Sequence, residues 1–425
     1  MTPSTSRRGL LAAAGATLLA GCSALDSEAN DDEEQISALR LREIVAGSGT
    51  TPIVADELPV GIEQSHIRAS TRRVDDLLAE LPVPFGPDSV PNGRIRQRLT
   101  EAAEEATDRV DEARTAPSRL AALDDLRWAR SEARYAAAGW AFADRGLTEA
   151  DLRRERAEIV GEADSFRSEF AYLGVDPVEA ALVYGRAERL LDSVLDDRYT
   201  PDPGEMSRLL AVAEWGDYVE SSRAELSDAR HFYDQYRSTL PDDAESVDDR
   251  LSAATETLRT DIQRRQKDIP PEPDGDDRLR WRLWDEIHDD ADANTERVYD
   301  PIGPASGLLA ATEGLTALLA ADRLGDRLDE GFDRPETVDD VRATRTEAVD
   351  AITSAREASP REDLARPMLA DAARSVSYAD ERLTEFDRDV RPSRLDHPIV
   401  EYTAATLRAR SVPAACETVL DALDR

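Results

Sequence analysis

The sequence predicts an all-α protein, built as irregular bundles of long antiparallel helices. Three observations support this fold class. Apolar residues recur three and four positions apart along most of the chain, helix start signals precede several of these stretches, and no stretch combines neighbouring β-branched strands with hairpin turns. An α-solenoid of helical hairpins is the alternative fold, although no repeat of about 34 residues is sustained.

Two stretches show the helical period most clearly, because each places its apolar residues on one face. The apolar residues are Leu279, Leu283, Trp284, Ile287 and Ala291 in the first stretch, and Val338, Val341, Ala348, Val349 and Ile352 in the second. Patterns of this kind predict roughly a dozen helices, several of them about 25 residues long.

Capping residues mark the expected starts of four helices. Three sites resemble capping boxes in which Asp replaces Glu or Gln, namely Thr148-x-x-Asp151, Ser246-x-x-Asp249 and Thr337-x-x-Asp340. A fourth site, Asp176-Pro177, combines an N-cap residue with Pro at the first helical position. We therefore expect a helix to begin directly after each of these N-cap residues.

Breaks rich in Pro, Gly and Asp interrupt the helical pattern at 82–93, 199–204 and 268–277. The last break contains Pro270, Pro271 and Pro273, which would stiffen a linker. The predicted organisation is a lipoprotein signal at 1–21, an acidic tether at 22–35, an N-terminal helical domain at 36–268, a Pro-rich linker at 269–277 and a C-terminal helical domain at 278–425.

The composition excludes several classes of protein. The 425 residues include 89 acids, 53 bases and two cysteines, and the formal net charge is −36. A nucleic-acid binder needs a basic face, a disulfide-stapled domain needs more than two cysteines, and a multi-span membrane protein needs a more apolar composition than this chain has.

Lys267 is the only lysine, and an acidic surface that nearly lacks lysine resembles the surfaces of proteins from extreme halophiles. At about 1 M salt the Debye length is about 3 Å, so long-range attraction between charges is nearly abolished. We therefore interpret the net charge as adaptation to a concentrated salt solution rather than as a sign of a basic partner.

The N-terminus carries an expected export signal. Arg7 and Arg8 precede an apolar stretch at 9–20, which is shorter than the roughly 20 residues that span a bilayer. The segment Ser6-Arg7-Arg8-Gly9-Leu10-Leu11 resembles a twin-arginine (Tat) signal, and Leu19-Ala20-Gly21-Cys22 is similar to a lipobox. Residues 1–22 thus resemble the start of Tat-exported lipoproteins of halophilic archaea.

This resemblance implies that Cys22 is lipidated on its sulfur and becomes the mature N-terminus. The lipid anchor would hold the protein at the extracellular face of the cell membrane. The second thiol, Cys416, precedes the apolar residues Val419 and Leu420, and we expect it to be buried and inert.

No catalytic or cofactor motif occurs in the sequence. The chain lacks the phosphate loop G-x-x-x-x-G-K-[ST], the fingerprint G-x-G-x-x-G, the elbow G-x-S-x-G, the zinc helix H-E-x-x-H and paired C-x-x-C. We therefore predict no nucleotide, no cofactor and no catalytic residue, and an enzyme is the less favoured interpretation. Gly303 and Gly307 precede an apolar stretch that Glu313 interrupts, which predicts a packing helix of a soluble bundle.

Three of the four histidines follow an acid by three residues, as Glu63/His66, Asp228/His231 and Asp285/His288. At this spacing a helix presents the carboxylate and the imidazole on one face. Di-iron helical bundles use Glu-x-x-His from two helices in this way, so these six residues are the candidate metal ligands. The alternative is that each histidine lies on a helix surface, bonded to its neighbouring acid.

Aromatic residues cluster in three stretches, and spacings of three or four predict that they lie in the core. A ligand groove between bundles is the alternative. The residues are Trp128, Tyr135 and Trp140 in the first stretch, Trp215, Tyr218, Phe232, Tyr233 and Tyr236 in the second, and Trp281 and Trp284 in the third.

The expected function combines the export signal with the helical body. We expect a lipid-anchored scaffold or protein-interaction module at the outer face of the cytoplasmic membrane, with a protein partner and without nucleic acid. One alternative is a metal- or solute-binding lipoprotein of helical-bundle type. Another is a hydrolase whose catalytic carboxylates are concealed among the 89 acids.

Overall fold

The structure of the chain is a computed structural model that describes residues 35–47, 54–198, 200–201, 204, 207–273, 275 and 277–425. In this part of the chain the regular structure comprises thirteen α-helices, two short 3-10 helices and one two-stranded ribbon, which confirms the all-α prediction. The Tat-like residues Arg7 and Arg8, the lipobox at 19–22 and the tether up to residue 34 lie outside the described residues.

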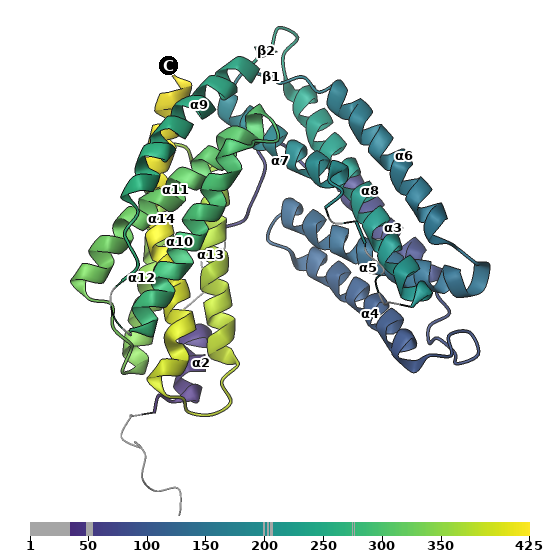
Figure 1. Ribbon diagram of the computed structural model, residues 1–425, viewed down its shortest axis with the longest axis horizontal. Coiled ribbons are helices and arrows are strands. Elements are labelled where there is room, and N and C mark those ends of the chain that lie inside the picture. The colour runs from purple at the N-terminus through teal and green to yellow at the C-terminus, as the bar shows by residue number, and fades with distance from the viewer. Residues whose placement is uncertain are drawn as a thin grey trace, which may run out of the picture.

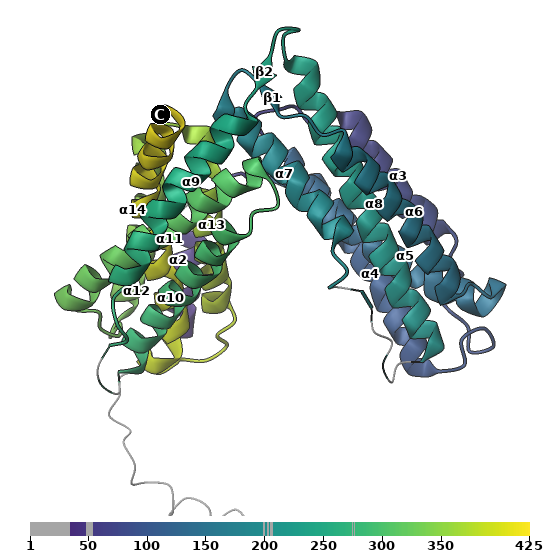
Figure 2. The ribbon, with the colours of Figure 1, turned by 45° about the horizontal axis from the view of Figure 1, so that its top comes forward.

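The helices form two arms that diverge from an apex (Figures 1 and 2). In the N-terminal arm, α3 and α4 pack on α5, α6 packs on α8, and α5 packs on α8. The helices of this arm are α3 (Gln64–Ala79), α4 (Gly93–Thr115), α5 (Arg119–Arg145), α6 (Glu149–Ser168) and α8 (Arg208–Thr239).

The C-terminal arm is built around α11, which packs against α9, α10 and α14. Its elements are α2 (Ala38–Gly47), α9 (Asp248–Arg265), η1 (Gln266–Asp268), α10 (Arg278–Tyr299), α11 (Pro304–Glu330), α12 (Val338–Ala358), α13 (Glu362–Thr384), η2 (Pro392–Leu395) and α14 (Asp396–Leu423).

The two arms are joined at the apex. The strands β1 (Leu173–Gly174) and β2 (Glu245–Ser246) pair antiparallel there (Figure 2). The helix α7 (Pro177–Leu195) packs against α8 on one side and α11 on the other. Because one helix contributes to both bundles, the main hydrophobic core is continuous from one arm into the other.

Side-chain caps fix three helix starts where the sequence predicts them. Capping boxes form at α6 and α12, and an aspartate caps α7 ahead of a proline. In each case the side chain accepts a hydrogen bond from a backbone N–H group that has no partner within the helix. The residues are Thr148 with Asp151, Thr337 with Asp340, and Asp176 before Pro177.

The expected capping box at Ser246 is wrong. The helix α9 begins at Asp248, after Val247, with no side-chain cap. Ser246 lies in β2, where it pairs with Leu173, so the ribbon holds its backbone extended one residue before the helix. Its hydroxyl accepts only a bond of 3.3 Å from the N–H of Asp248.

The segment at 269–277 connects two helices of the same arm, because both α9 and α10 pack on α11. Two tryptophans hold its described residues against α10. Trp284 donates its indole N–H to the carbonyl of Pro270 at 3.0 Å, and Trp281 donates to Glu272 at 2.9 Å. The packing changes from one arm to the other at β2, and α2 also packs in the C-terminal arm, on α13 and α12.

By length and composition α11 could cross a membrane, but 83% of its apolar window is buried within the fold. Its neighbours α7, α9, α10 and α14 cover it. This burial agrees with the packing helix that the sequence predicts, since the core helix of a bundle is apolar on most of its sides.

The aromatic residues divide between the core and the surface. Trp215, Phe232 and Tyr236 are buried, as expected for core residues. The expectation is wrong for Trp128, whose exposed fraction is 64%, and for Trp281, whose exposed fraction is 41%. Trp128 lies two residues beyond the buried Leu126, so the helical period turns it to the solvent side of α5.

Candidate functional site

Two of the three acid-x-x-His pairs converge in the N-terminal arm. His66 lies in the first turn of α3 and His231 lies in α8, and their rings stack in parallel with centroids 4.1 Å apart and an interplanar angle of 1°. The third pair, Asp285 and His288, lies on α10 in the other arm. There the ring of His288 meets Trp284 edge-on, with centroids 4.5 Å apart.

Each stacked histidine uses its Nε2 atom in a hydrogen bond. The Nε2 of His66 lies 2.7 Å from Oδ1 of Asp228, and the Nε2 of His231 accepts the backbone N–H of Glu63 at 3.3 Å. The Glu63 carboxylate accepts instead from the hydroxyl of Ser65 at 2.8 Å. A metal ion bound at Nε2 of either imidazole would have to replace one of these bonds. In the part of the chain that the structure describes, no three His, Cys, Asp or Glu side chains are grouped as metal ligands.

The carboxylate of Asp228 connects the histidine stack to a row of alternating charges. Asp228 is 1% exposed, and its Oδ2 accepts from Arg127 on α5 at 3.3 Å. Arg127 also pairs with Asp124, and Asp124 accepts from Arg186 on α7 at 2.7 Å. The row therefore runs from α8 through α5 to α7, which is the helix that joins the arms.

Burial lowers the pKa of His231, and the neighbouring His66 lowers it further, because a second positive charge in the stack would be repelled. The nearby carboxylates of Asp228, Glu63 and Asp234 act in the opposite direction. The charge of His231 therefore responds to acidification of the medium.

The row of charges ends at a small cavity between the arms. The cavity has a volume of about 30 Å³ and lies between α5, α7, α11, α13 and residues 56–58, which belong to the connection from α2 in one arm to α3 in the other. Arg186 lines it, its buried Nε has no partner among the described residues, and burial lowers the pKa of this guanidinium. Burial also raises the pKa of Asp56, which lines the same cavity. A cavity of this size has room for one or two water molecules, which the unpartnered Nε of Arg186 could bind.

Glu188 fixes the position of α11 against α7. Its carboxylate, 4% exposed, accepts the backbone N–H of Ser306 at 2.6 Å and that of Ala305 at 3.4 Å. The N-cap residue of α11 is Gly303, which has no side chain to cap the helix, so Glu188 supplies the cap from α7. A Cβ atom at Gly303 would lie 2.3 Å from Oε1 of Glu188, so this close approach requires glycine.

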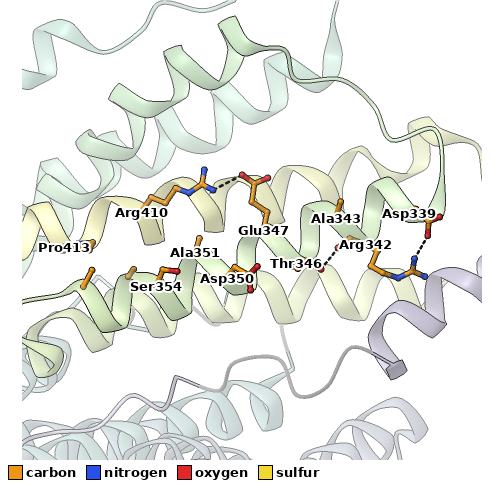
Figure 3. A pocket seen from close by; sticks show the side chains of 12 residues that line it. Asp339, Arg342, Ala343, Thr346, Glu347, Asp350, Ala351, Ser354, Arg410 and Pro413 are labelled. Atoms are coloured by element: carbon orange, nitrogen blue, oxygen red, sulfur yellow. Dashed lines mark hydrogen bonds and ion pairs between the residues drawn. The ribbon is translucent and has the colours of Figure 1, made fainter.

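An open groove of about 860 Å³ runs along α12 beside α14 (Figure 3). We call it the α12 groove. Both of its arginines are bonded to acids of the lining, since Arg342 pairs with Asp339 and Arg410 donates to Glu347 at 2.9 Å (Figure 3). The acid Asp350 is exposed between these pairs and Ser354. The lining residues are Asp339, Arg342, Ala343, Thr346, Glu347, Asp350, Ala351, Ser354, Ala355, Ala358, Arg410 and Pro413.

Small side chains contribute part of the accessible surface of the α12 groove. Ala343, Thr346 and Ser354 are exposed at spacings that keep them on one face of α12. The two ion pairs hold the long arginine side chains beside acids, so small residues and the exposed Asp350 remain accessible along about 20 Å of helix.

The sequence did not reveal Glu188, Arg186 or the α12 groove as site residues. Glu188 is one of 89 acids, and nothing in its local sequence distinguishes a carboxylate that caps a distant helix. Gly303-Pro304 is a recognisable helix start that lacks a capping side chain, and this was the one available signal that a cap must come from elsewhere.

Comparisons with known proteins divide the chain into two parts. Residues 65–243 match a family described as a domain of unknown function (DUF8262), and residues 248–421 match one described as a domain of unknown function (DUF8264). The two matched segments adjoin at β2, where the packing also changes from one arm to the other. No curated protein and no solved structure matches the chain.

Proposed function

We propose that this protein is a lipid-anchored interaction module, exported by the Tat pathway to the outer face of the cytoplasmic membrane, and that the α12 groove binds its protein partner. The observation that carries the proposal is the α12 groove itself, in which small exposed side chains lie beside two internal ion pairs. Small residues allow the backbone of a second helix to approach closely, at the 8–10 Å that separates packed helices.

The location of the groove also supports this proposal. The described chain begins at residue 35 and enters the C-terminal arm through α2, which packs on α12 and α13. The arm that carries the α12 groove is therefore the arm that follows the proposed anchor at Cys22 along the chain. A partner in or near the membrane would meet this arm first.

Filling the groove tests the partner site. Thr346→Trp with Ser354→Trp places two indole rings in the α12 groove, whereas Ser252→Trp with Thr257→Trp places them at two exposed positions of α9 as the matched control. We expect a protein to co-purify in molar salt with the parent lipoprotein and with the α9 control, and to be lost from the α12 variant. Equal recovery with both variants would overturn the assignment of the groove.

Replacement of the proposed lipidation site tests the anchor separately. Cys22→Ser removes the sulfur that would carry the lipid, so we expect the protein in the medium or as an unprocessed precursor. Membrane fractionation and the mass of the mature chain measure both outcomes. A variant that is processed and retained in membranes like the parent would contradict lipidation at Cys22.

A further inference from the structure

A second groove lies in the N-terminal arm, between α3 and α4 and above α5, with a volume of about 700 Å³. We call it the arginine groove. Both α3 and α4 pack extensively on α5 but touch each other little, which leaves the space between them open. The lining residues are Gln64, Ile67, Arg68, Thr71, Arg72, Val110, Ala113, Arg114, Ala116, Pro117, Ser118, Arg119, Ala122 and Leu126.

The charge of this groove is opposite to that of the chain. Four arginines line it and no acid does, although the chain has 89 acids and 53 bases. Arg68 and Arg72 lie on α3, Arg114 in the last turn of α4 and Arg119 at the start of α5, and all four are exposed. Three helices thus direct cations to one opening.

Two of these cations have no partner. Within the described part of the chain, Arg68 and Arg72 make no ion pair and no hydrogen bond. They stand four residues apart on one helix face, where like charges repel each other. Arg119 donates to the carbonyl of Ile62 at 2.6 Å, and Arg114 pairs with Asp111 in its own helix. In the α12 groove, by contrast, both arginines are bonded to acids of the lining.

The floor of the arginine groove is apolar. Leu126 and Val110 are buried beneath it, and Ile67 and Ala113 are half-buried at its walls. An apolar floor with polar groups at the rim, in a volume between about 300 and 1,000 Å³, is typical of a site for a small organic ligand. In such a site the apolar floor would contact the apolar body of a ligand, and the unpaired guanidinium groups would bind a charged headgroup.

We infer that the arginine groove binds an organic phosphate with an apolar body, whose headgroup is held by Arg68 and Arg72. Guanidinium groups bind phosphate oxygens through two parallel hydrogen bonds, and phosphate carries more charge than a carboxylate for two or more arginines to neutralise. In concentrated salt, long-range attraction is screened and direct contacts remain, so burial of the apolar body contributes to the affinity. This site goes beyond the proposed partner binding at the α12 groove and does not depend on it.

The probe for this inference is octyl phosphate, below its micelle concentration, measured by isothermal titration calorimetry with the full chain in molar salt. Arg68→Gln with Arg72→Gln is expected to weaken binding at least about tenfold, because two charge-assisted contacts are lost. The matched control is Arg154→Gln with Arg167→Gln on α6, which removes two exposed arginines outside the groove and is expected to leave the affinity unchanged.

Two measurements separate binding from folding. The Gln variant removes a repulsive pair, so its melting temperature is expected to be no lower than that of the parent. Arg68→Lys with Arg72→Lys keeps the charge but not the planar fork, and its affinity is expected between those of the parent and the Gln variant. Thr346→Trp is expected to bind octyl phosphate like the parent, which distinguishes this site from the α12 groove.

Other ligands define the results that would overturn the inference. Equal affinity for octyl glucoside would remove the role of the phosphate, and equal affinity for inorganic phosphate would remove the role of the apolar body. Poly-glutamate that displaced octyl phosphate at equal affinity would assign the groove to an acidic polypeptide. Arg68- and Arg72-dependent flotation with vesicles of anionic phospholipid would support a membrane lipid as the source of the phosphate, and binding without flotation would support a free ester.

Discussion

Removal of the Glu188 carboxylate tests whether one side chain holds the two arms together. In Glu188→Ala, the N–H groups of Ser306 and Ala305 lose their acceptor at the start of a helix that is buried on most sides. A hydrogen bond to a charged group contributes about 1.5–3 kcal/mol, and a charge at a helix N-terminus adds about 0.3–1 kcal/mol. We expect Glu188→Ala to lower the free energy of unfolding by about 3 kcal/mol, and Glu188→Gln, which keeps an acceptor, by about half as much.

The partner substitution is Gly303→Ala. The backbone of Gly303 is extended, with φ −166° and ψ 178°, so alanine adds no backbone strain there. Its Cβ would lie 2.3 Å from Oε1 of Glu188 and would displace the carboxylate. The matched control is Gly161→Ala inside α6, where a Cβ meets no atom within 4 Å, and this change is expected to stabilise the chain by up to about 1 kcal/mol.

Urea unfolding in molar KCl, followed by tryptophan fluorescence, gives the free energies for the single and double variants. If the clash acts through Glu188, Gly303→Ala should cost at least about 1 kcal/mol less in the Glu188→Ala background than in the parent. Additive effects, or a Glu188→Ala variant within about 0.5 kcal/mol of the parent, would refute the assignment of Glu188 as the cap of α11.

Three further predictions follow from buried titratable groups. Burial raises the pKa of Asp217 to about 6, so the folded chain binds this proton more tightly than the unfolded chain. The stability of the parent therefore falls as the pH rises from about 4 to about 6. In urea titrations, the free energy of unfolding of Asp217→Asn should exceed that of the parent by about 2 kcal/mol near pH 7 and by little near pH 4. The lowered pKa of His231 has the opposite consequence. The contribution of the neutral imidazole to stability is complete above the unfolded pKa of about 6.5 and is lost as the pH falls below it. In thermal unfolding, the His231→Phe variant should therefore lose less stability on acidification than the parent loses. Burial raises the pKa of the Cys416 thiol to about 12, so a Cys22→Ser chain should react with a thiol reagent only when unfolded, and rapid reaction of the native chain would show that the thiol is accessible.

Local signals in the sequence were sufficient for the helices and for many of their ends. The spacing of Leu279, Leu283 and Ile287 predicts the buried face of α10, and all three side chains are buried. Asp176 before Pro177 predicts the start of α7. The buried face of α10 and the start of α7 each depend on residues within one or two helical turns of each other. A short stretch of sequence is therefore enough to predict them. Ser246 is the exception, because its partner in the ribbon is more than 70 residues away.

The candidate site could be predicted only in part. The acid-x-x-His spacing identified His66 and His231, but it could not show that their rings stack or that Asp285 and His288 lie in the other arm. The spacing also suggested that each histidine bonds the acid of its own pair. In the structure, the carboxylate of Asp228 instead bonds His66, which lies on a different helix.

The sequence by itself determined the helical fold class and, through residues 1–22, the expectation of an exported lipoprotein, because both depend on short-range patterns. Only the tertiary structure decided which charges meet. It set Glu188 beneath the start of α11, joined the arms through α7 and left Arg68 and Arg72 together at an opening without acids. The physical reason is that a charge acts through its neighbours in space, and helices of similar composition can pack in many ways until their contacts select one of them.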